Sequence, residues 1–307
     1  MRIFYIVLCS LYLALSCNES SAQKHVTKKP VSHIFLIAFD GMSASAIRSG
    51  AEMPTLRKLM AEGSSTLEAR SILPSNSAPN WSSMFMGAGN ELHGYNTWGS
   101  TKPDFPAREI GRGGVFPNIF GVYRDSNSKA EIGIAYEWDV IRKLTDTTAL
   151  NFSLFAPTSD TNQRGITDAS VKYIKEKKPN LFVASFGDPD HTGHTYGWGS
   201  KEYMSRLTEL DGYLSELLAA IKAAGIEDSS LVIVTADHGG KEKSHGSGSM
   251  EEMQIPIVIW GYGVKKNHQM TSSIMIYDIA STIISAKHLS QPQVWIGRPI
   301  WDGFALK

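Results

Sequence analysis

The chain has 307 residues, of which 42% are hydrophobic and 20% are charged, and its formal net charge at pH 7 is zero. This composition is typical of a globular protein with enough apolar material for a core, and the length favours one large domain with small insertions. A neutral balance argues against a nucleic-acid-binding face, which needs clustered basic residues. It does not exclude a small anionic ligand held by a few local charges or metal ions.

The N-terminus has the pattern of an export signal. Arg2 precedes the apolar run Ile3–Leu15, which is too short to span a bilayer, and small residues follow it up to Ala22. We therefore predict a signal peptide over residues 1–22, a polar linker over 23–30 and one domain over 31–307. The protein is expected to be exported, to the periplasm or the cell exterior, with no transmembrane segment.

The two cysteines of the chain, Cys9 and Cys17, both lie in this leader. The mature domain therefore has no disulfide and no thiol that could act as ligand or nucleophile. The sequence Ala14-Leu15-Ser16-Cys17 resembles a lipoprotein cleavage site, although leucine is missing three residues before the cysteine. A lipid anchor at Cys17 is thus the alternative to cleavage after Ala22.

The first half of the domain begins with a buried-strand pattern at His33–Phe39, which ends in Asp40-Gly41. An amphipathic helix is predicted over Met53–Gly63. A loop over Ser71–Pro79 follows, and Pro79 suits the first turn of a helix that runs to Met86. Ser77 would then lie at or just before a helix N-terminus. The glycine-rich, polar stretch over residues 90–115 is predicted to be a long functional loop.

The second half alternates helices and strands. Helices are predicted over Phe116–Arg124, Thr167–Lys178, Glu202–Ala224 and Ser273–Lys287. Strands are predicted over Glu131–Tyr136, Leu181–Phe186, Leu231–Thr235 and Ile255–Trp260. This alternation predicts an α/β fold, a single domain with a central, predominantly parallel sheet and helices on both faces.

Three of the predicted core strands end in residues that can bind metal ions. These residues are Asp40, Asp190, His194, Asp237 and His238, and His245 follows on a glycine loop. Ligands in open α/β sheets bind outside the carboxyl ends of the strands, so we expect these six side chains on loops at one edge of the sheet. Carboxylates mixed with imidazoles suit zinc, with manganese as the second choice, and six ligands match two ions at three ligands each.

Two metal ions close together suit in-line displacement at phosphorus. Ser77 is the expected attacking oxygen, because a free serine is a poor nucleophile and the chain has no nucleophile-elbow motif, which leaves metal coordination to activate it. The helix that begins near Ser77 would favour a phosphoryl oxygen at its N-terminus.

These motifs, in this order, resemble those of the alkaline phosphatase superfamily, and within it the nucleotide pyrophosphatase/phosphodiesterase branch. The resemblance covers essentially the whole mature chain. It rests on Asp40-Gly41, on the stretch Pro74 to Asn80 with Ser77 at its centre, on His93-Gly94, on the Asp-x-x-Gly-His motif from Asp190 to His194, on Asp237-His238-Gly239 and on His245-Gly246.

The resemblance implies a division of the ligands between two metals. Asp190, His194 and His245 would hold one ion, and a second ion would be held by Asp40, Asp237 and His238, with Ser77 bridging. Many members of the family also have an asparagine about twenty residues after the nucleophile that binds a phosphoryl oxygen. Counting without gaps reaches Trp98, and Asn96, two residues earlier, is assigned that role.

The predicted function is that of an exported two-metal phosphodiesterase or nucleotide pyrophosphatase, a hydrolase of small phosphate esters that forms a phospho-Ser77 intermediate. Cleavage of phosphate monoesters is the alternative, but such enzymes usually add a cationic group, and no arginine follows Ser77 closely. A sulfatase and a non-catalytic binding protein are less favoured, because Ser75 and Ser77 lack the sulfatase context and all six ligands are present. The sequence carries no pattern that specifies an oligomeric state.

Overall fold

The computed structural model describes residues 24–157 and 164–305. The predicted signal peptide and Cys17 lie outside these residues. Within the described part, none of the helices has both the length and the apolar character needed to cross a membrane.

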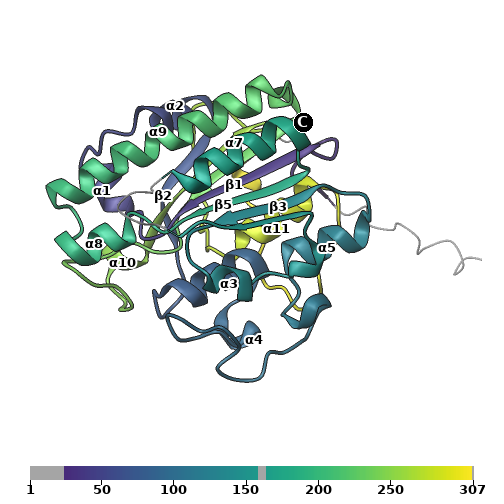
Figure 1. The fold of residues 1–307 in the computed structure, drawn as a ribbon, viewed down its shortest axis with the longest axis horizontal. Coiled ribbons are helices and arrows are strands. Elements are labelled where there is room, and N and C mark those ends of the chain that lie inside the picture. The colour runs from purple at the N-terminus through teal and green to yellow at the C-terminus, as the bar shows by residue number, and fades with distance from the viewer. Residues whose placement is uncertain (1–23, 158–163, 306–307) are drawn as a thin grey trace, which may run out of the picture.

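One eight-stranded sheet forms the centre of the molecule (Figure 1), with the strand order β4-β3-β5-β1-β6-β7-β2-β8. Only β7 runs antiparallel to its neighbours β6 and β2, and the other pairings among the described strands are parallel. The strands are β1 (His33–Phe39), β2 (Ser64–Arg70), β3 (Ile132–Tyr136), β4 (Phe152–Phe155), β5 (Leu181–Phe186), β6 (Ser230–Thr235), β7 (Gln254–Gly261) and β8 (His268–Gln269). The predicted α/β fold with a predominantly parallel sheet is confirmed.

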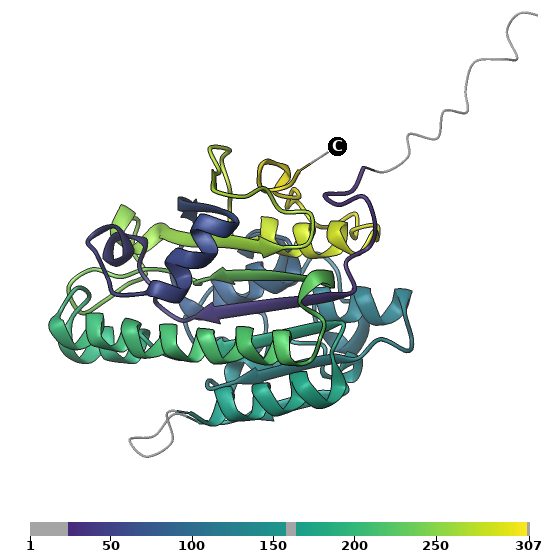
Figure 2. The ribbon, with the colours of Figure 1, turned by 90° about the horizontal axis from the view of Figure 1, so that it is seen from above.

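Helices cover both faces of this sheet, as Figures 1 and 2 show. One face carries α2 (Pro54–Glu62), α7 (Gly165–Lys177) and α9 (Lys201–Ala223), and the other carries α3 (Ser77–Met86), α5 (Ile119–Ser126) and α11 (Asp278–Ala286). The remaining α-helices are short: α1 (Ala44–Arg48), α4 (Asn90–His93), α6 (Val140–Lys143), α8 (Asp190–Tyr196) and α10 (Met250–Met253).

The strands that end in the predicted ligands are neighbours at the centre of the sheet. β1 pairs with β5 on one side and with β6 on the other, both in parallel. Their carboxyl ends therefore meet at one edge and bring Asp40, Asp190 and Asp237 together. The carboxyl end of β2 reaches the same edge, because β2 and β6 are both antiparallel to β7. The loop that precedes α3 starts there.

Three strands and part of a loop differ from the prediction. β2, β4 and β8 were not predicted, because β2 (SSTLEAR) and β4 (FSLF) lack a continuous apolar run and β8 has only two residues. The stretch 90–115 was predicted to be irregular throughout, but it contains α4 and a 3-10 turn at Arg112–Gly114. The helix predicted from Phe116 begins later, because the Asn118 side chain caps it by accepting hydrogen bonds from the backbone of Phe120 and Gly121.

The segment predicted as a linker is packed onto the domain in its described part. Val26 is fully buried in the core, and its backbone N–H donates to Ser285 Oγ at 3.0 Å. The His25 ring stacks on His288, which follows α11. Residues 23–30 are otherwise polar, so the burial of Val26 was not predicted.

Candidate active site

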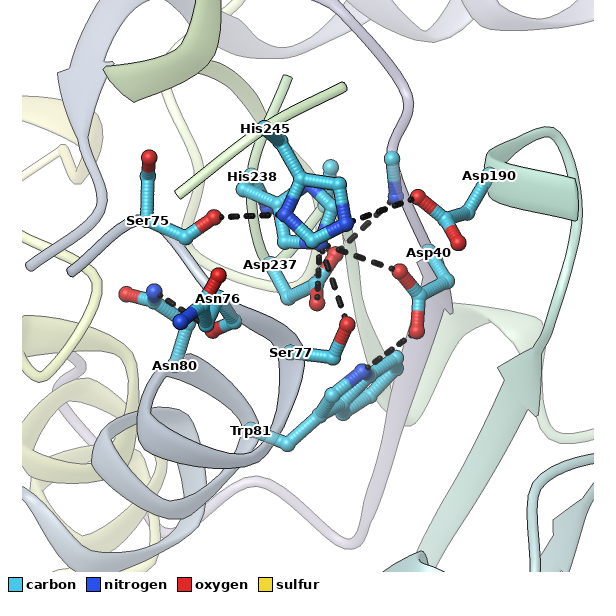
Figure 3. Close-up of polar contacts among 12 residues, drawn as sticks. Asp40, Ser75, Asn76, Ser77, Asn80, Trp81, Asp190, Asp237, His238 and His245 are labelled. Atoms are coloured by element: carbon cyan, nitrogen blue, oxygen red, sulfur yellow. Dashed lines mark hydrogen bonds and ion pairs between the residues drawn. The ribbon is translucent and has the colours of Figure 1, made fainter. Parts of the chain in front are cut away.

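The inner triad consists of Asp40, Asp237 and His238, and all three side chains are buried (Figure 3). His238 Nε2 lies 3.3 Å from Asp40 Oδ1 and 3.3 Å from Asp237 Oδ2. The other oxygen of each carboxylate is hydrogen-bonded, Asp40 Oδ2 by the indole N–H of Trp81 at 3.0 Å and Asp237 Oδ1 by the backbone N–H of Gly41 at 3.0 Å. Each carboxylate is thus anchored by one oxygen and presents the other to the histidine.

The outer triad consists of Asp190, His194 and His245, and it lies nearer the surface. His245 Nε2 is 3.1 Å from His194 Nε2 and 3.4 Å from Asp190 Oδ1. Asp190 and His194 were predicted on a loop, but both lie on helix α8, one turn apart. The spacing of four residues places both side chains on one face of that helix, which sets the distance between them.

Each of the three ligand histidines is held by a backbone carbonyl. The acceptors are Lys243 O for His194 at 2.9 Å, Gly239 O for His238 at 2.7 Å and Ser75 O for His245 at 2.9 Å. Because a carbonyl only accepts, the Nδ1 atom of each ring carries the proton and Nε2 is left with a lone pair. All three lone-pair nitrogens belong to the triads, and this arrangement is typical of metal-binding histidines.

The donor set fits divalent metal ions. In a tetrahedral site with metal–ligand bonds of roughly 2.0–2.1 Å, the ligand atoms lie about 3.3 Å apart. The corresponding distances are 3.3 Å in the inner triad and 3.1–3.5 Å in the outer triad. Three buried oxygens, Asp40 Oδ1, Asp190 Oδ1 and Asp237 Oδ2, have no hydrogen-bond partner among the described residues. An unpaired buried polar atom reduces the stability of the folded protein by about 1–3 kcal/mol, and by more when it is charged. Bound cations would remove this cost for the three oxygens.

The electrostatics of the protein alone support the same conclusion. Burial, reinforced by the neighbouring carboxylates, raises the pKa of both Asp40 and Asp190 well above the ordinary value for aspartate. Burial also lowers the pKa of His238 to about 4 and that of His245 to about 3. The imidazoles are therefore neutral near pH 7, as metal binding requires, while the carboxylates need a compensating positive charge.

Ser77 lies beside the inner triad, at the first position of α3. Its Oγ donates to His238 Nε2 at 3.2 Å, nearly the same distance that separates His238 from each carboxylate. The loop before it is braced by Asn80, whose side-chain amide donates to Asn76 O at 2.9 Å and whose Oδ1 accepts from Ile72 N at 2.7 Å. One turn after Ser77, Trp81 holds Asp40, so α3 positions both the hydroxyl and a triad carboxylate.

A search against family models matches this chain to "Type I phosphodiesterase / nucleotide pyrophosphatase" over residues 34–105 and 95–253. The match covers more than half of the chain and includes all six triad residues and Ser77. The chain belongs to this family.

Curated relatives match this chain over part of their own length. Bis(5'-adenosyl)-triphosphatase ENPP4 of Bos taurus is 26% identical over 243 residues, which cover 74% of this chain and 50% of the bovine protein. Ectonucleotide pyrophosphatase/phosphodiesterase family member 7 of Mus musculus is 36% identical over 81 residues, 26% of this chain and 18% of the mouse protein. The chain thus spans half or less of the length of these relatives.

Solved structures share the fold. An inactive variant of murine ectonucleotide pyrophosphatase/phosphodiesterase 5 in complex with AMP superposes with a TM-score of 0.69 at 14% identity and covers 88% of this chain and 98% of that chain. BT1596, a 2-O GAG sulfatase, superposes with a TM-score of 0.70 at 12% identity and covers 89% of this chain and 73% of that one. This chain therefore has the alkaline phosphatase-like fold that its motifs predicted.

Asn96, assigned above to a phosphoryl oxygen, lies in the loop that follows α4. Its Oδ1 accepts from Asn90 Nδ2 at 2.7 Å, and its backbone N–H donates to Asp104 at 2.7 Å. The backbone of Trp98 lies beside the nucleophile loop, since its carbonyl accepts from the N–H of Ala78, the residue after Ser77, at 3.0 Å. The role of Asn96 stays a prediction.

Trp198 supports the site in a way that the sequence did not reveal. Its indole N–H donates to Gly41 O at 3.0 Å, and its ring packs edge-on against His194. A Cβ atom at Gly240 would lie 2.1 Å from the indole, so glycine is required there to admit the ring. Gly41 itself has a φ of +71° and faces Asp190 at a distance that excludes a Cβ atom. The Asp-Gly and Gly-Gly steps were visible in the sequence, but their partner Trp198 was not.

His93 supports the turn after α4, and its burial makes the stability of the protein depend on pH. Its ring is fully buried, with Nε2 donating to Ser83 Oγ at 3.0 Å and Nδ1 accepting from Tyr95 N at 3.1 Å. Burial lowers the pKa of His93 to about 3, so the unfolded chain binds a proton that the folded chain does not take up between about pH 6.5 and pH 3. Stability should fall as the pH drops through this window.

We expect the free energy of unfolding of His93→Gln to fall less steeply with decreasing pH than that of the wild type. The difference in slope should reach about 1.4 kcal/mol per pH unit, which corresponds to one proton. Urea unfolding of both proteins, without metal and at several values between about pH 4 and pH 7, measures the two slopes. The other histidines contribute equally to both proteins, so equal slopes would show that buried His93 does not resist protonation.

Proposed function

We propose that this protein is an exported, two-metal phosphodiesterase or nucleotide pyrophosphatase that acts through a phospho-Ser77 intermediate. The observation that carries the proposal is the distance of 3.2 Å between Ser77 Oγ and His238 Nε2, next to two triads of imidazoles and unpaired carboxylate oxygens. Membership of the phosphodiesterase family supports the reaction class.

The residues of the chain have separate tasks in this mechanism. Asp40, Asp237 and His238 would hold one divalent ion, and Asp190, His194 and His245 would hold the other, zinc being the first choice and manganese the second. When bound, the ions supply positive charge that favours the serine alkoxide and neutralises phosphoryl oxygens. Ser77 Oγ gives up its proton to water and forms a bond to phosphorus while the bond to the leaving oxygen breaks, and the leaving alkoxide takes a proton from water. Water then hydrolyses the phosphoserine and restores the hydroxyl.

Helix α3 assists this reaction in two ways. Ser77 occupies its first position, so the positive end of the helix dipole lies at the reacting phosphoryl group and favours negative charge there. The buried Trp81 N–H holds Asp40 in place at 3.0 Å from the opposite side. The nucleophile and one face of the inner triad are therefore preorganised by the same rigid element.

A comparison of three esters with the same leaving group tests the proposal. We expect kcat/KM for bis(4-nitrophenyl) phosphate to exceed that for 4-nitrophenyl phosphate and for 4-nitrophenyl sulfate by at least about tenfold, since no arginine follows Ser77 closely to meet the extra charge of a monoester. The measurement uses metal-free protein to which zinc or manganese is added, and the same protein with a chelator is the control. A faster rate on the monoester would show a phosphomonoesterase, and a faster rate on the sulfate would show a sulfatase.

A further inference from the structure

Glu252 is a buried carboxylate that the proposed reaction does not use. It lies in α10 and is 6% exposed. Its oxygens accept hydrogen bonds from the backbone N–H of Ser247, from Ser247 Oγ at 2.7 Å and from Ser249 Oγ at 3.1 Å, and Ser75 Oγ lies 3.2 Å away. One carboxylate thus contacts both the loop that carries His245 and the loop that carries Ser77.

A simple helix cap does not account for these contacts. Ser249 and Glu252 have the spacing of a capping box, in which the glutamate returns to the backbone N–H of the first residue. Here that N–H, of Ser249, points instead to Ser247 Oγ at 3.4 Å, and the carboxylate faces Ser247 and Ser75. The helix that would be capped has only four residues. The contacts of Glu252 therefore join two loops.

Both loops end at the candidate metal centre. Ser75 O accepts the Nδ1 proton of His245 at 2.9 Å, which turns Nε2 of that ring toward Asp190 (Figure 3). The same Nε2 atom lies 3.1 Å from His194 Nε2. Ser75 Oγ also accepts from Gly246 N at 3.0 Å, and it shares its single proton between Ser247 O at 2.6 Å and the Glu252 carboxylate at 3.2 Å. Ser75 is two residues before Ser77, and Ser247 is two residues after His245. A change at Glu252 would therefore reach the nucleophile loop and the outer triad together.

Glu252 is suited to this role by its charge. Burial acts to raise its pKa, but the hydrogen bonds from Ser247, Ser249 and Ser75 outweigh that effect and hold the pKa below the ordinary value for glutamate. The group is then a carboxylate at neutral pH, with enough lone pairs to accept several hydrogen bonds at once.

We infer that Glu252 is a positioning residue that clamps the His245–Ser249 loop to the Ser77 loop and thereby holds His245 in the outer triad. This inference rests on the proposed function only in taking the outer triad to be a metal site. Residues that orient metal ligands typically change metal affinity or activity by 10–100-fold when they are removed. We expect Glu252→Ala to weaken zinc binding at the outer triad by that factor and to leave the buried inner triad unchanged.

Zinc titration of metal-free protein, in competition with a chromogenic chelator, measures the affinity of each of the two sites. Wild-type protein should bind two zinc ions tightly, and Glu252→Ala should bind one tightly and one 10–100-fold more weakly. Phosphodiesterase activity of the variant should then recover most of its kcat when zinc is raised to saturate the weak site. A loss caused by general misfolding would not be restored by zinc, and the thermal unfolding of each protein is measured alongside.

Glu251→Ala is the matched control, because Glu251 is adjacent and exposed, and its side-chain ion pair is a 3.8 Å contact with Lys241. It should bind zinc like the wild type. Glu252→Gln, which keeps the size and one acceptor, and Ser75→Ala, which keeps the carbonyl to His245, should lie between the wild type and Glu252→Ala. These two milder variants carry the test if Glu252→Ala does not fold.

The outcomes separate the two proposals. A folded Glu252→Ala with both wild-type zinc affinities would overturn the inference. Wild-type protein that binds two zinc ions without hydrolysing any phosphodiester would instead overturn the proposed function, and the zinc comparison among variants would still decide the role of Glu252.

Discussion

Ser77→Ala should lower the turnover of phosphodiesters by several orders of magnitude, the scale seen when other enzymes lose their nucleophile. The substitution removes only the Oγ atom, which lies 3.2 Å from His238 Nε2. Both triads keep their three protein ligands, so the metal content should stay at that of the wild type. Turnover and metal content, measured on the same preparation, test this prediction.

Ser77→Thr is the matched control for the same position. It restores a hydroxyl, and the phosphodiesterase branch that the motifs of this chain resemble often has threonine as the nucleophile, so measurable activity is expected. Full activity in Ser77→Ala would mean that water attacks phosphorus directly, and the phosphoserine step would have to be abandoned. Loss of metal from Ser77→Ala would show that the serine oxygen is needed to hold an ion.

Asp237→Asn should remove most of the activity and one of two bound metal ions. Asparagine has the shape of aspartate, and its oxygen can still accept from the N–H groups of Gly41 and His238, which lie 3.0 and 2.9 Å from Asp237 Oδ1. What changes is the oxygen that faces His238 at 3.3 Å, which becomes an amide nitrogen without a negative charge. Elemental analysis and kinetics measure the two losses.

The same substitution should have the opposite effect on the metal-free protein. Burial raises the pKa of both Asp40 and Asp190, and repulsion by Asp237 adds to this effect, so neutralising Asp237 removes a repulsion among three neighbouring carboxylates. Metal-free Asp237→Asn should therefore unfold at a temperature no lower than that of the metal-free wild type. Zinc should raise the unfolding temperature of the wild type more than that of the variant. A variant with wild-type turnover and two bound metals would show that the ligand assignment is wrong.

Much of the site was predictable because strand ends are local features. A buried strand leaves a continuous apolar run, and a polar residue directly after it, such as Asp40 or Asp237, must lie at the carboxyl edge of a parallel sheet. The division of the six ligands into two sets came from the family resemblance, and the structure places the side chains in the same two groups. The helix start at Ser77 followed from Pro79 in its first turn.

Other features depended on contacts between distant segments. β2 has few apolar residues and β4 has only four residues, so neither is recognised alone, and each is a strand because a neighbouring strand supplies its hydrogen bonds. Asp190 and His194 were expected on a loop, since the short helix α8 has a glycine within it and no apolar face to reveal it.

The sequence by itself thus determined the fold class and the chemical identity of the groups at the sheet edge. Only the tertiary structure decided which atom of each group faces the site. Trp81 binds one oxygen of Asp40 and leaves the other facing the site, and Ser75 O determines which nitrogen of His245 carries the proton. Glu252 contacts Ser75, 177 residues away in the sequence, and so connects the loops of Ser77 and His245. These are hydrogen bonds between side chains and segments far apart in the chain, and no local periodicity or propensity specifies such partners.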